Sequence, residues 1–154
     1  MKLHALDLST SVGSAVMERG RPPLLQTLRL VGDRAHMLGT FATWLDEMHM
    51  VHRFGGVAWE RPILTPKDKV DKLEILYGLV GIAYAFAGRH KLPHCEVTIQ
   101  EVKFALTGRS NADKVDMIAA AMKIGWKPAT DHEADAGAVG IHAMGILNPK
   151  RVAA

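Results

Sequence analysis

The sequence predicts a single α/β domain in which helices flank a mixed five-stranded sheet. Three observations carry this prediction. Three strand-like segments joined by short turns come first, a stretch with apolar residues at helical spacing follows, and two more strand-like segments then alternate with helical ones. A length of 154 residues suits one domain, so we expect residues 1–154 to form one unit.

The first third favours an antiparallel meander. We expect strands over residues 2–8, 12–18 and 24–31. The turn before the third strand is Arg19-Gly20-Arg21-Pro22-Pro23, in which glycine and two prolines disfavour both a ladder and a helix. Short connections of this kind join antiparallel neighbours.

A helix and a fourth strand follow. After Gly32-Asp33, five apolar residues recur at spacings of 4, 3, 4 and 3, which places them on one helical face: Met37, Phe41, Trp44, Met48 and Val51. Residues 57–60 form a short apolar run that ends on Glu60 and is stopped by Pro62. A strand reached through a helix is most simply parallel to the strand before it.

The second half predicts three more helices and one strand. Pro66 suits the first turn of a helix over residues 67–88, whose second half is apolar on nearly every side. Such a helix is buried all round, and one side could face another subunit. A fifth strand is expected over residues 93–100. Capping boxes at Ser110-Asn111-Ala112-Asp113 and Thr130-Asp131-His132-Glu133 predict helices to about residues 123 and 144.

Composition narrows the class of protein. The single cysteine, Cys95, forbids an intramolecular disulfide, and the amino terminus lacks the apolar core of a signal peptide, so we expect a cytoplasmic protein. The longest apolar stretch, residues 75–87, is too short to span a bilayer. A net charge of +3 permits nucleic acid as a partner without requiring it.

Three acids stand out by position. Asp7 closes the first strand, Glu60 closes the fourth, and Asp135 lies one turn into the last helix. One edge of such a sheet is where these folds place their sites, and converging carboxylates need a cation, for which oxygen ligands select Mg²⁺ or Mn²⁺. Two such ions about 4 Å apart would clamp the attacking water and the leaving oxygen of a phosphodiester. Taken singly, an acid at a strand end is more often only a solvated loop edge.

The first turn of the last helix holds three further candidates. His132 lies three residues before Asp135 and shares its helical face, where it is a ligand, a proton carrier or an exposed side chain. Glu133 is at the third position of the capping box, so helix capping is its expected role. Asp131 in the first turn favours the helix dipole whatever the function.

Basic residues between the fifth strand and the last helix are the remaining candidates. Lys103 and Lys114 lie eleven residues apart, with Arg109 in the loop between them. Such residues are ordinarily surface charge. Beside a carboxylate–metal site they could hold the scissile phosphate or the neighbouring backbone.

The ordered set of these residues resembles the RuvC family of Holliday-junction resolvases, within the ribonuclease H-like superfamily. The likeness runs from Leu3 to about Ala143. It rests on five pieces in order: Ala5-Leu6-Asp7-Leu8-Ser9, Val57-Ala58-Trp59-Glu60-Arg61-Pro62, Glu101-Val102-Lys103, Ala112-Asp113-Lys114 and His132-Glu133-Ala134-Asp135-Ala136.

The resemblance implies a ribonuclease H-like fold and a nuclease that works as a homodimer on four-way DNA, with two Mg²⁺ ions in each site and Mn²⁺ as a substitute. Metal ligands would be Asp7, Glu60, Asp135 and His132, the last matching a position that is Asp in some relatives and His in others. Whether Asp131 or Glu133 supplies that fourth ligand instead stays open.

Further roles follow from the same resemblance. Lys103 would match the active-site lysine and Lys114 a DNA-contacting one, with Arg109 as a further candidate for DNA contact. Water attack would cut one strand per subunit and leave a 5′-phosphate and a 3′-hydroxyl. The apolar helix over residues 67–88 would form the dimer.

The chain departs from cellular members of that family. They usually have Asp-Pro-Gly where this chain has Asp7-Leu8-Ser9, and a Leu where it has Gly137; Ile63 lies where an aromatic is expected. These features look more like the resolvase-like proteins of phages and prophages, which often accept forks and other branches.

Two alternatives remain open. One is a catalytically inactive subunit that only binds branched DNA; the surviving acids argue against it. The other starts from Leu6-Asp7-Leu8-Ser9-Thr10-Ser11, which resembles the phosphate loop of actin-like sugar kinases and so predicts a nucleotide-binding protein. A protein of that kind needs a second lobe to close over the nucleotide, and it would give Glu60 and Asp135 no role.

Overall fold

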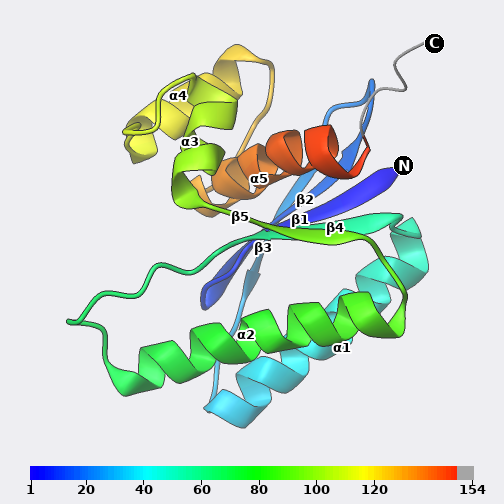
Figure 1. Cartoon of the computed structure of the whole chain (residues 1–154), viewed down its shortest axis with the longest axis vertical. Helices are drawn as coiled ribbons and strands as arrows, with labels where there is room; N and C mark the ends of the chain where they lie inside the picture. The colour runs from blue at the N-terminus through cyan, green and yellow to red at the C-terminus, as the bar shows by residue number, and fades with distance from the viewer. Residues whose placement is uncertain (149–154) are drawn as a thin grey trace.

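The fold is seen in a computed structural model, which describes residues 1–148. Within these residues the chain forms one five-stranded sheet in the order β3-β2-β1-β4-β5, flanked by helices (Figure 1). The strands are β1 (Lys2–Asp7), β2 (Ser11–Glu18), β3 (Leu24–Arg29), β4 (Gly56–Glu60) and β5 (His94–Val97). The helices are α1 (Arg34–His52), α2 (Val70–Arg89), α3 (Ile99–Thr107), α4 (Lys114–Lys123) and α5 (Asp131–Leu147).

The sheet topology confirms the predicted fold class. Strands β1, β2 and β3 pair antiparallel, while β1 pairs parallel with β4 and β4 parallel with β5. The parallel pairs follow from the helical crossovers α1 and α2, as expected for strands joined through a helix. The carboxyl ends of β1, β4 and β5 therefore meet at one edge of the sheet.

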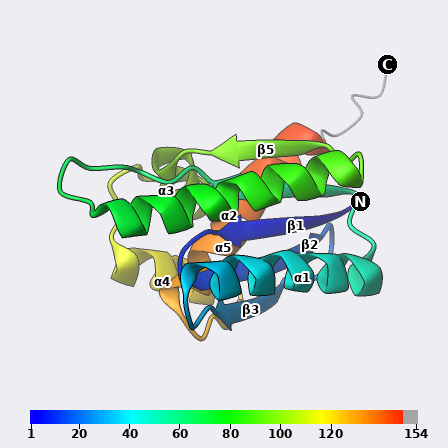
Figure 2. The ribbon, with the colours of Figure 1, turned by 90° about the horizontal axis from the view of Figure 1, so that it is seen from below.

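Helices cover both faces of the sheet. Figure 2 shows α1 and α2 side by side across one face, and Figure 1 shows α5, α3 and α4 on the other. Each face has its own apolar core: Phe41, Trp59 and Phe86 are fully buried on the α1–α2 side. Small residues dominate the α5 side, including Ala5, Ala58 and Ala136, so α5 lies close to the strands.

Several boundaries differ from the prediction. Helix α2 begins at Val70, with Lys69 as its N-cap, so Pro66 does not open it. Val51, assigned to the buried face of α1, is 73% exposed, because the buried face of this helix runs through Phe41, Leu45 and Met48. The cap of α4 is Asp113, paired reciprocally with Asp116, rather than Ser110.

One helix was missed altogether. The strand expected over residues 93–100 ends at Val97, and α3 follows at once. A capping box between Thr98 and Glu101 opens α3, since each side chain accepts from the other residue's backbone N–H. Lys103 therefore lies on a helix that packs on α5.

Helix α2 is not buried on every side within this chain. Leu79, Ala83 and Phe86 face the sheet, whereas Tyr77 is 55% exposed. Tyr84 is 44% exposed, and its ring packs edge-on against Trp59 of β4. None of the helices in residues 1–148 has the length and apolar character needed to cross a membrane.

Candidate active site

The two strand-end acids lie side by side at the carboxyl edge of the sheet. Asp7 ends β1 and Glu60 ends β4, and these strands are parallel neighbours in which Leu6 pairs with Trp59. The next residue on each strand is one of the acids. Parallel pairing thus brings together two carboxylates that are 53 positions apart in the sequence.

Helix α5 brings the third acid to the same edge. Thr130 caps the helix by accepting from the N–H of Glu133, as predicted. The box is not reciprocal, however: the Glu133 carboxylate accepts from the N–H of Ala129 and from the hydroxyl of Thr27. Asp135 lies one turn into the helix, where it is close enough to Asp7 and Glu60 for their charges to act on one another.

The pKa values of the acids record this convergence. Burial, then the charges of Asp7 and Asp135, raise the pKa of Glu60 to about 8. Burial, then the charges of Asp7 and Asp131, raise the pKa of Asp135 to about 6. Ionising all three carboxylates together is therefore unfavourable, and a bound cation would offset their repulsion.

His132 is in direct contact with this cluster. Its Nδ1 donates to Asp7 Oδ2 at 2.6 Å, and the hydrogen bond raises the pKa of the imidazole. The two side chains are 30% and 15% exposed. Asp131, by contrast, turns away to Lys114.

The basic candidates occupy different positions. The charge of Lys103 on α3 acts on Glu60, which places it beside the acids. Lys114 at the start of α4 binds Asp131 at 2.5 Å, and the charges of Asp135 and Asp7 also raise its pKa. Arg109 pairs with Asp116 at 2.8 Å, on the α3–α4 side. The structure thus brings both lysines to the acids and leaves Arg109 further out.

Known structures share this architecture. No family model matches the sequence. RuvC from Thermus thermophilus superposes with a TM-score of 0.77 at 21% identity, covering 95% of each chain. The same bacterium's RuvC in complex with a Holliday junction substrate gives a TM-score of 0.79 at 20% identity over 92% of each chain. The chain has the RuvC fold.

A more distant structure agrees. The yeast mitochondrial Holliday junction resolvase Ydc2 matches with a TM-score of 0.63 at 10% identity, over 92% of this chain and 77% of that one. At these identities the likeness is one of fold. It confirms the ribonuclease H-like class expected from the sequence.

The donor set of this RuvC-like chain suits a hard divalent cation. Asp7, Glu60 and Asp135 offer carboxylate oxygens, and His132 adds an imidazole nitrogen, the chemistry that Mg²⁺ and Mn²⁺ accept. Over residues 1–148, no three His, Cys, Asp or Glu side chains are already arranged to hold an ion. The hydrogen bond from His132 occupies Asp7 Oδ2 in this structure.

Two residues that seat α5 on the sheet of the RuvC fold were not anticipated. Gly13 lies under His132, and Thr27 contacts Glu133. A lone glycine inside a strand is a known sign of close backbone approach, so Gly13 was detectable. Thr27 carries no such sign, because an exposed threonine on an edge strand is ordinary.

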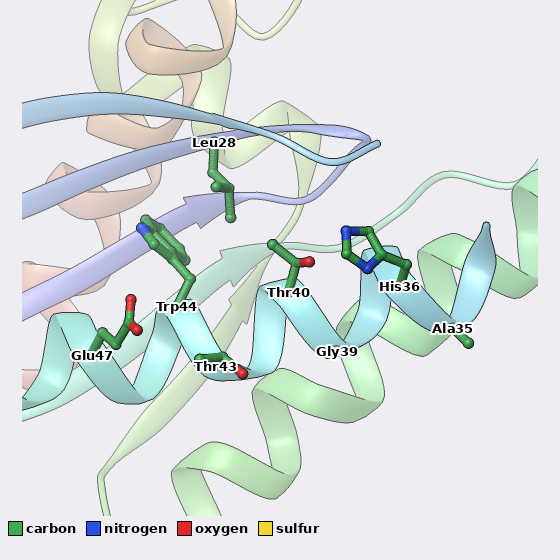
Figure 3. Close-up of a pocket in the computed structure, with 8 residues that line it drawn as sticks. All are labelled: Leu28, Ala35, His36, Gly39, Thr40, Thr43, Trp44 and Glu47. Carbon is green, nitrogen blue, oxygen red and sulfur yellow. The ribbon is translucent and has the colours of Figure 1, made fainter. Parts of the chain in front are cut away.

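A pocket elsewhere does not belong to this site. It measures about 600 Å³ and lies between α1 and β3, lined by Leu28, His36, Thr40 and Trp44 among others (Figure 3). It opens on the α1 face of the sheet, opposite α5. None of Asp7, Glu60 and Asp135 lines it.

Proposed function

We propose that this chain is a structure-selective endonuclease that hydrolyses phosphodiester bonds in Holliday junctions and other branched DNA. The observation that carries the proposal is the cluster of Asp7, Glu60 and Asp135 at one edge of a RuvC fold, where burial and then neighbouring charges raise the pKa values of Glu60 and Asp135. A similar fold has been solved bound to a Holliday junction substrate, which supports branched DNA as the substrate.

Mg²⁺ is the proposed cofactor, with two ions per site and Mn²⁺ as a substitute. Asp7, Glu60, Asp135 and His132 would hold the ions, which when bound would activate water and stabilise the leaving oxygen. Release of a 5′-phosphate is part of the proposal.

The protein's own side chains position the DNA and manage charge. Lys103, whose charge already acts on Glu60, would hold the scissile phosphate. Lys114 would exchange Asp131 for a backbone phosphate, because both are anionic oxygen acceptors. Arg109 would contact DNA further from the cut, after leaving Asp116. His132 would release Asp7 as the cations enter.

A homodimer, a phage or prophage role and a cytoplasmic location complete the proposal. The exposed face of α2, with Tyr77, would form the subunit contact, since large aromatics are enriched at such contacts. Two subunits would present two sites and cut two strands of one junction.

The test is cleavage of a labelled four-way junction beside a fork and a linear duplex, with Mg²⁺ or with chelator. We expect metal-dependent nicks in the branched substrates only. Asp7→Asn should abolish cleavage and leave junction binding intact, because it removes a ligand charge with little change of shape. Unchanged cleavage by Asp7→Asn would refute the site.

The same assay separates the alternatives. Tight junction binding without cutting in any metal would support an inactive binding subunit. Neither binding nor cutting would favour the nucleotide-binding alternative. In the structure Ser9 Oγ accepts from the N–H of Ser11 and donates to its carbonyl. The Ser9 hydroxyl and the Ser11 N–H of the phosphate-loop candidate are therefore bonded to each other within the turn.

A further inference from the structure

A row of three residues crosses the sheet beneath the first turn of α5. Asp7 on β1 pairs with Gly13 on β2, and Gly13 pairs with Thr27 on β3. Directly paired residues of neighbouring strands present their side chains to the same face. All three positions therefore face α5, and each meets a different part of its first turn.

Gly13 is the point of closest approach. A Cβ at this position would overlap the carbonyl group of His132 and lie 3.0 Å from its Cβ. Backbone, unlike the end of a flexible side chain, cannot move aside locally. Any larger residue must therefore lift the start of α5 by about 1 Å or more to reach ordinary contact distances.

Thr27 holds the other side of the same turn. Its hydroxyl donates to Glu133 Oε1 at 2.9 Å and accepts from the hydroxyl of Thr130, also at 2.9 Å. Thr130 in turn accepts from the N–H of Glu133, which closes a ring of three hydrogen bonds. Glu133 is 6% exposed, an unusual burial for a carboxylate, and its second oxygen accepts from Ala129 N–H at 2.7 Å.

These contacts lie on both sides of His132 and one turn before Asp135. A helix held at two points on a rigid sheet cannot slide or tilt freely. These contacts therefore set how far Asp135 lies from Asp7. Gly13 has no side chain, and the Thr27 hydroxyl is already bound to Glu133 and Thr130, so neither takes part in the chemistry.

We propose that Gly13 and Thr27, the latter through the buried Glu133, are positioning residues that fix the spacing between the α5 ligands and Asp7. The inference rests on the proposed function, because the acids must act as metal ligands for their spacing to matter. It assigns a role to Gly13, Thr27 and Glu133 that goes beyond helix capping.

The decisive variant is Thr27→Val, which keeps the shape of the side chain and removes the hydroxyl. Mn²⁺ affinity is measured by calorimetry on the full chain without DNA, followed by the junction dissociation constant and single-turnover cleavage. We expect about tenfold weaker Mn²⁺ binding, a matching rise in the Mn²⁺ needed for half-maximal cleavage, and unchanged junction affinity. Thr27→Ser keeps the hydroxyl and should keep both the Mn²⁺ affinity and the Mn²⁺ requirement of wild type.

A matched control separates positioning from general stability. Ser14→Ala removes the hydrogen bond to the buried His4 on the opposite face of the sheet, next to Gly13 in sequence. It should lower the melting temperature but leave Mn²⁺ affinity unchanged. If Thr27→Val lowers the melting temperature and likewise leaves Mn²⁺ affinity unchanged, the residue is merely structural and the inference is wrong.

Gly13→Ala gives the larger effect where it folds. A displacement of about 1 Å at a catalytic group lowers the cleavage rate by about a hundredfold. Folded Gly13→Ala with wild-type cleavage and Mn²⁺ affinity would overturn the inference; if it does not fold, Thr27→Val decides. If the wild-type protein binds no Mn²⁺ and cuts no DNA, the proposed function itself is wrong. If the wild type binds Mn²⁺ and cuts DNA but Thr27→Val is unaffected, only the present inference is wrong.

Discussion

Removing the charge of Glu60 should change how the stability of the metal-free protein depends on pH. The folded protein raises the pKa of Glu60 from 4.5 to about 8, chiefly by burial and then by the charges of Asp7 and Asp135. The folded state thus keeps a proton that the unfolded chain releases. Stability is therefore full below about pH 4.5 and is lost as the pH rises through about 8.

The size of the effect follows from the same values. Each pH unit between 4.5 and about 8 costs about 1.4 kcal/mol, so the loss approaches about 5 kcal/mol. Asp135, whose pKa is about 6, titrates within this range and shares the repulsion. We therefore expect about 3 to 5 kcal/mol, a large part of the roughly 5–15 kcal/mol that stabilises a typical domain.

The assay is urea unfolding in EDTA at pH 5, 6, 7 and 8, followed by tryptophan fluorescence. Glu60→Gln keeps the shape and cannot ionise. The variant should be about as stable as wild type at pH 5 and about 3 to 5 kcal/mol more stable at pH 8. Mg²⁺ should then stabilise wild type at pH 8 and have little effect on the variant, since a ligand charge is missing.

Comparison of the two proteins at each pH cancels the titrating groups that do not interact with Glu60. If the difference in unfolding free energy is the same at pH 5 and pH 8, Glu60 is not a buried acid in a repulsive cluster. The reasoning that assigns it to a cation site would then fail.

Three further predictions concern other parts of the molecule. Lys114→Ala should weaken junction binding. It should also lower by about one the slope of log binding constant against log salt concentration, measured by titration at several salt concentrations. An unchanged slope would mean that Lys114 does not contact a phosphate. Burial lowers the pKa of His4 to about 3, so the free energy of unfolding should fall as the pH drops from about 6.5 toward 3. His4→Gln should lose less stability over this pH range than wild type. An equal loss in both proteins would contradict the prediction. Sedimentation at micromolar concentration should show a dimer of the 16.8 kDa chain that Tyr77→Arg on α2 dissociates; a wild-type monomer would exclude α2 as a dimer face.

Much of the fold could be predicted from local patterns. Alternating apolar residues and short turns identified β1, β2 and β3, and a strand reached through a helix was correctly taken as parallel. These patterns also identified Asp7 and Glu60 as strand-end acids, whereas the strand order that makes β1 and β4 neighbours came from the structure. The capping threonine Thr130 located the start of α5 and so the position of Asp135.

Helix α3 shows where a local pattern misled. Cys95, Val97 and Ile99 alternate as a strand would, so the strand was extended past its end. The capping box of Thr98 and Glu101 was the signal that a helix begins there. Buried parallel strands and buried helices look alike over a few residues, which makes such boundaries the least certain part of the sequence.

The sequence by itself determined which residues end the strands and begin the last helix, because strand alternation and helix capping depend on neighbours along the chain. Only the tertiary structure decided how the acids meet. The contact of His132 with Asp7 joins residues 125 positions apart, and that of Thr27 with Glu133 joins residues 106 apart. Their geometry depends on how closely α5 can approach the sheet, and that distance is set by the absent side chain of Gly13 and by two small-residue surfaces packing together.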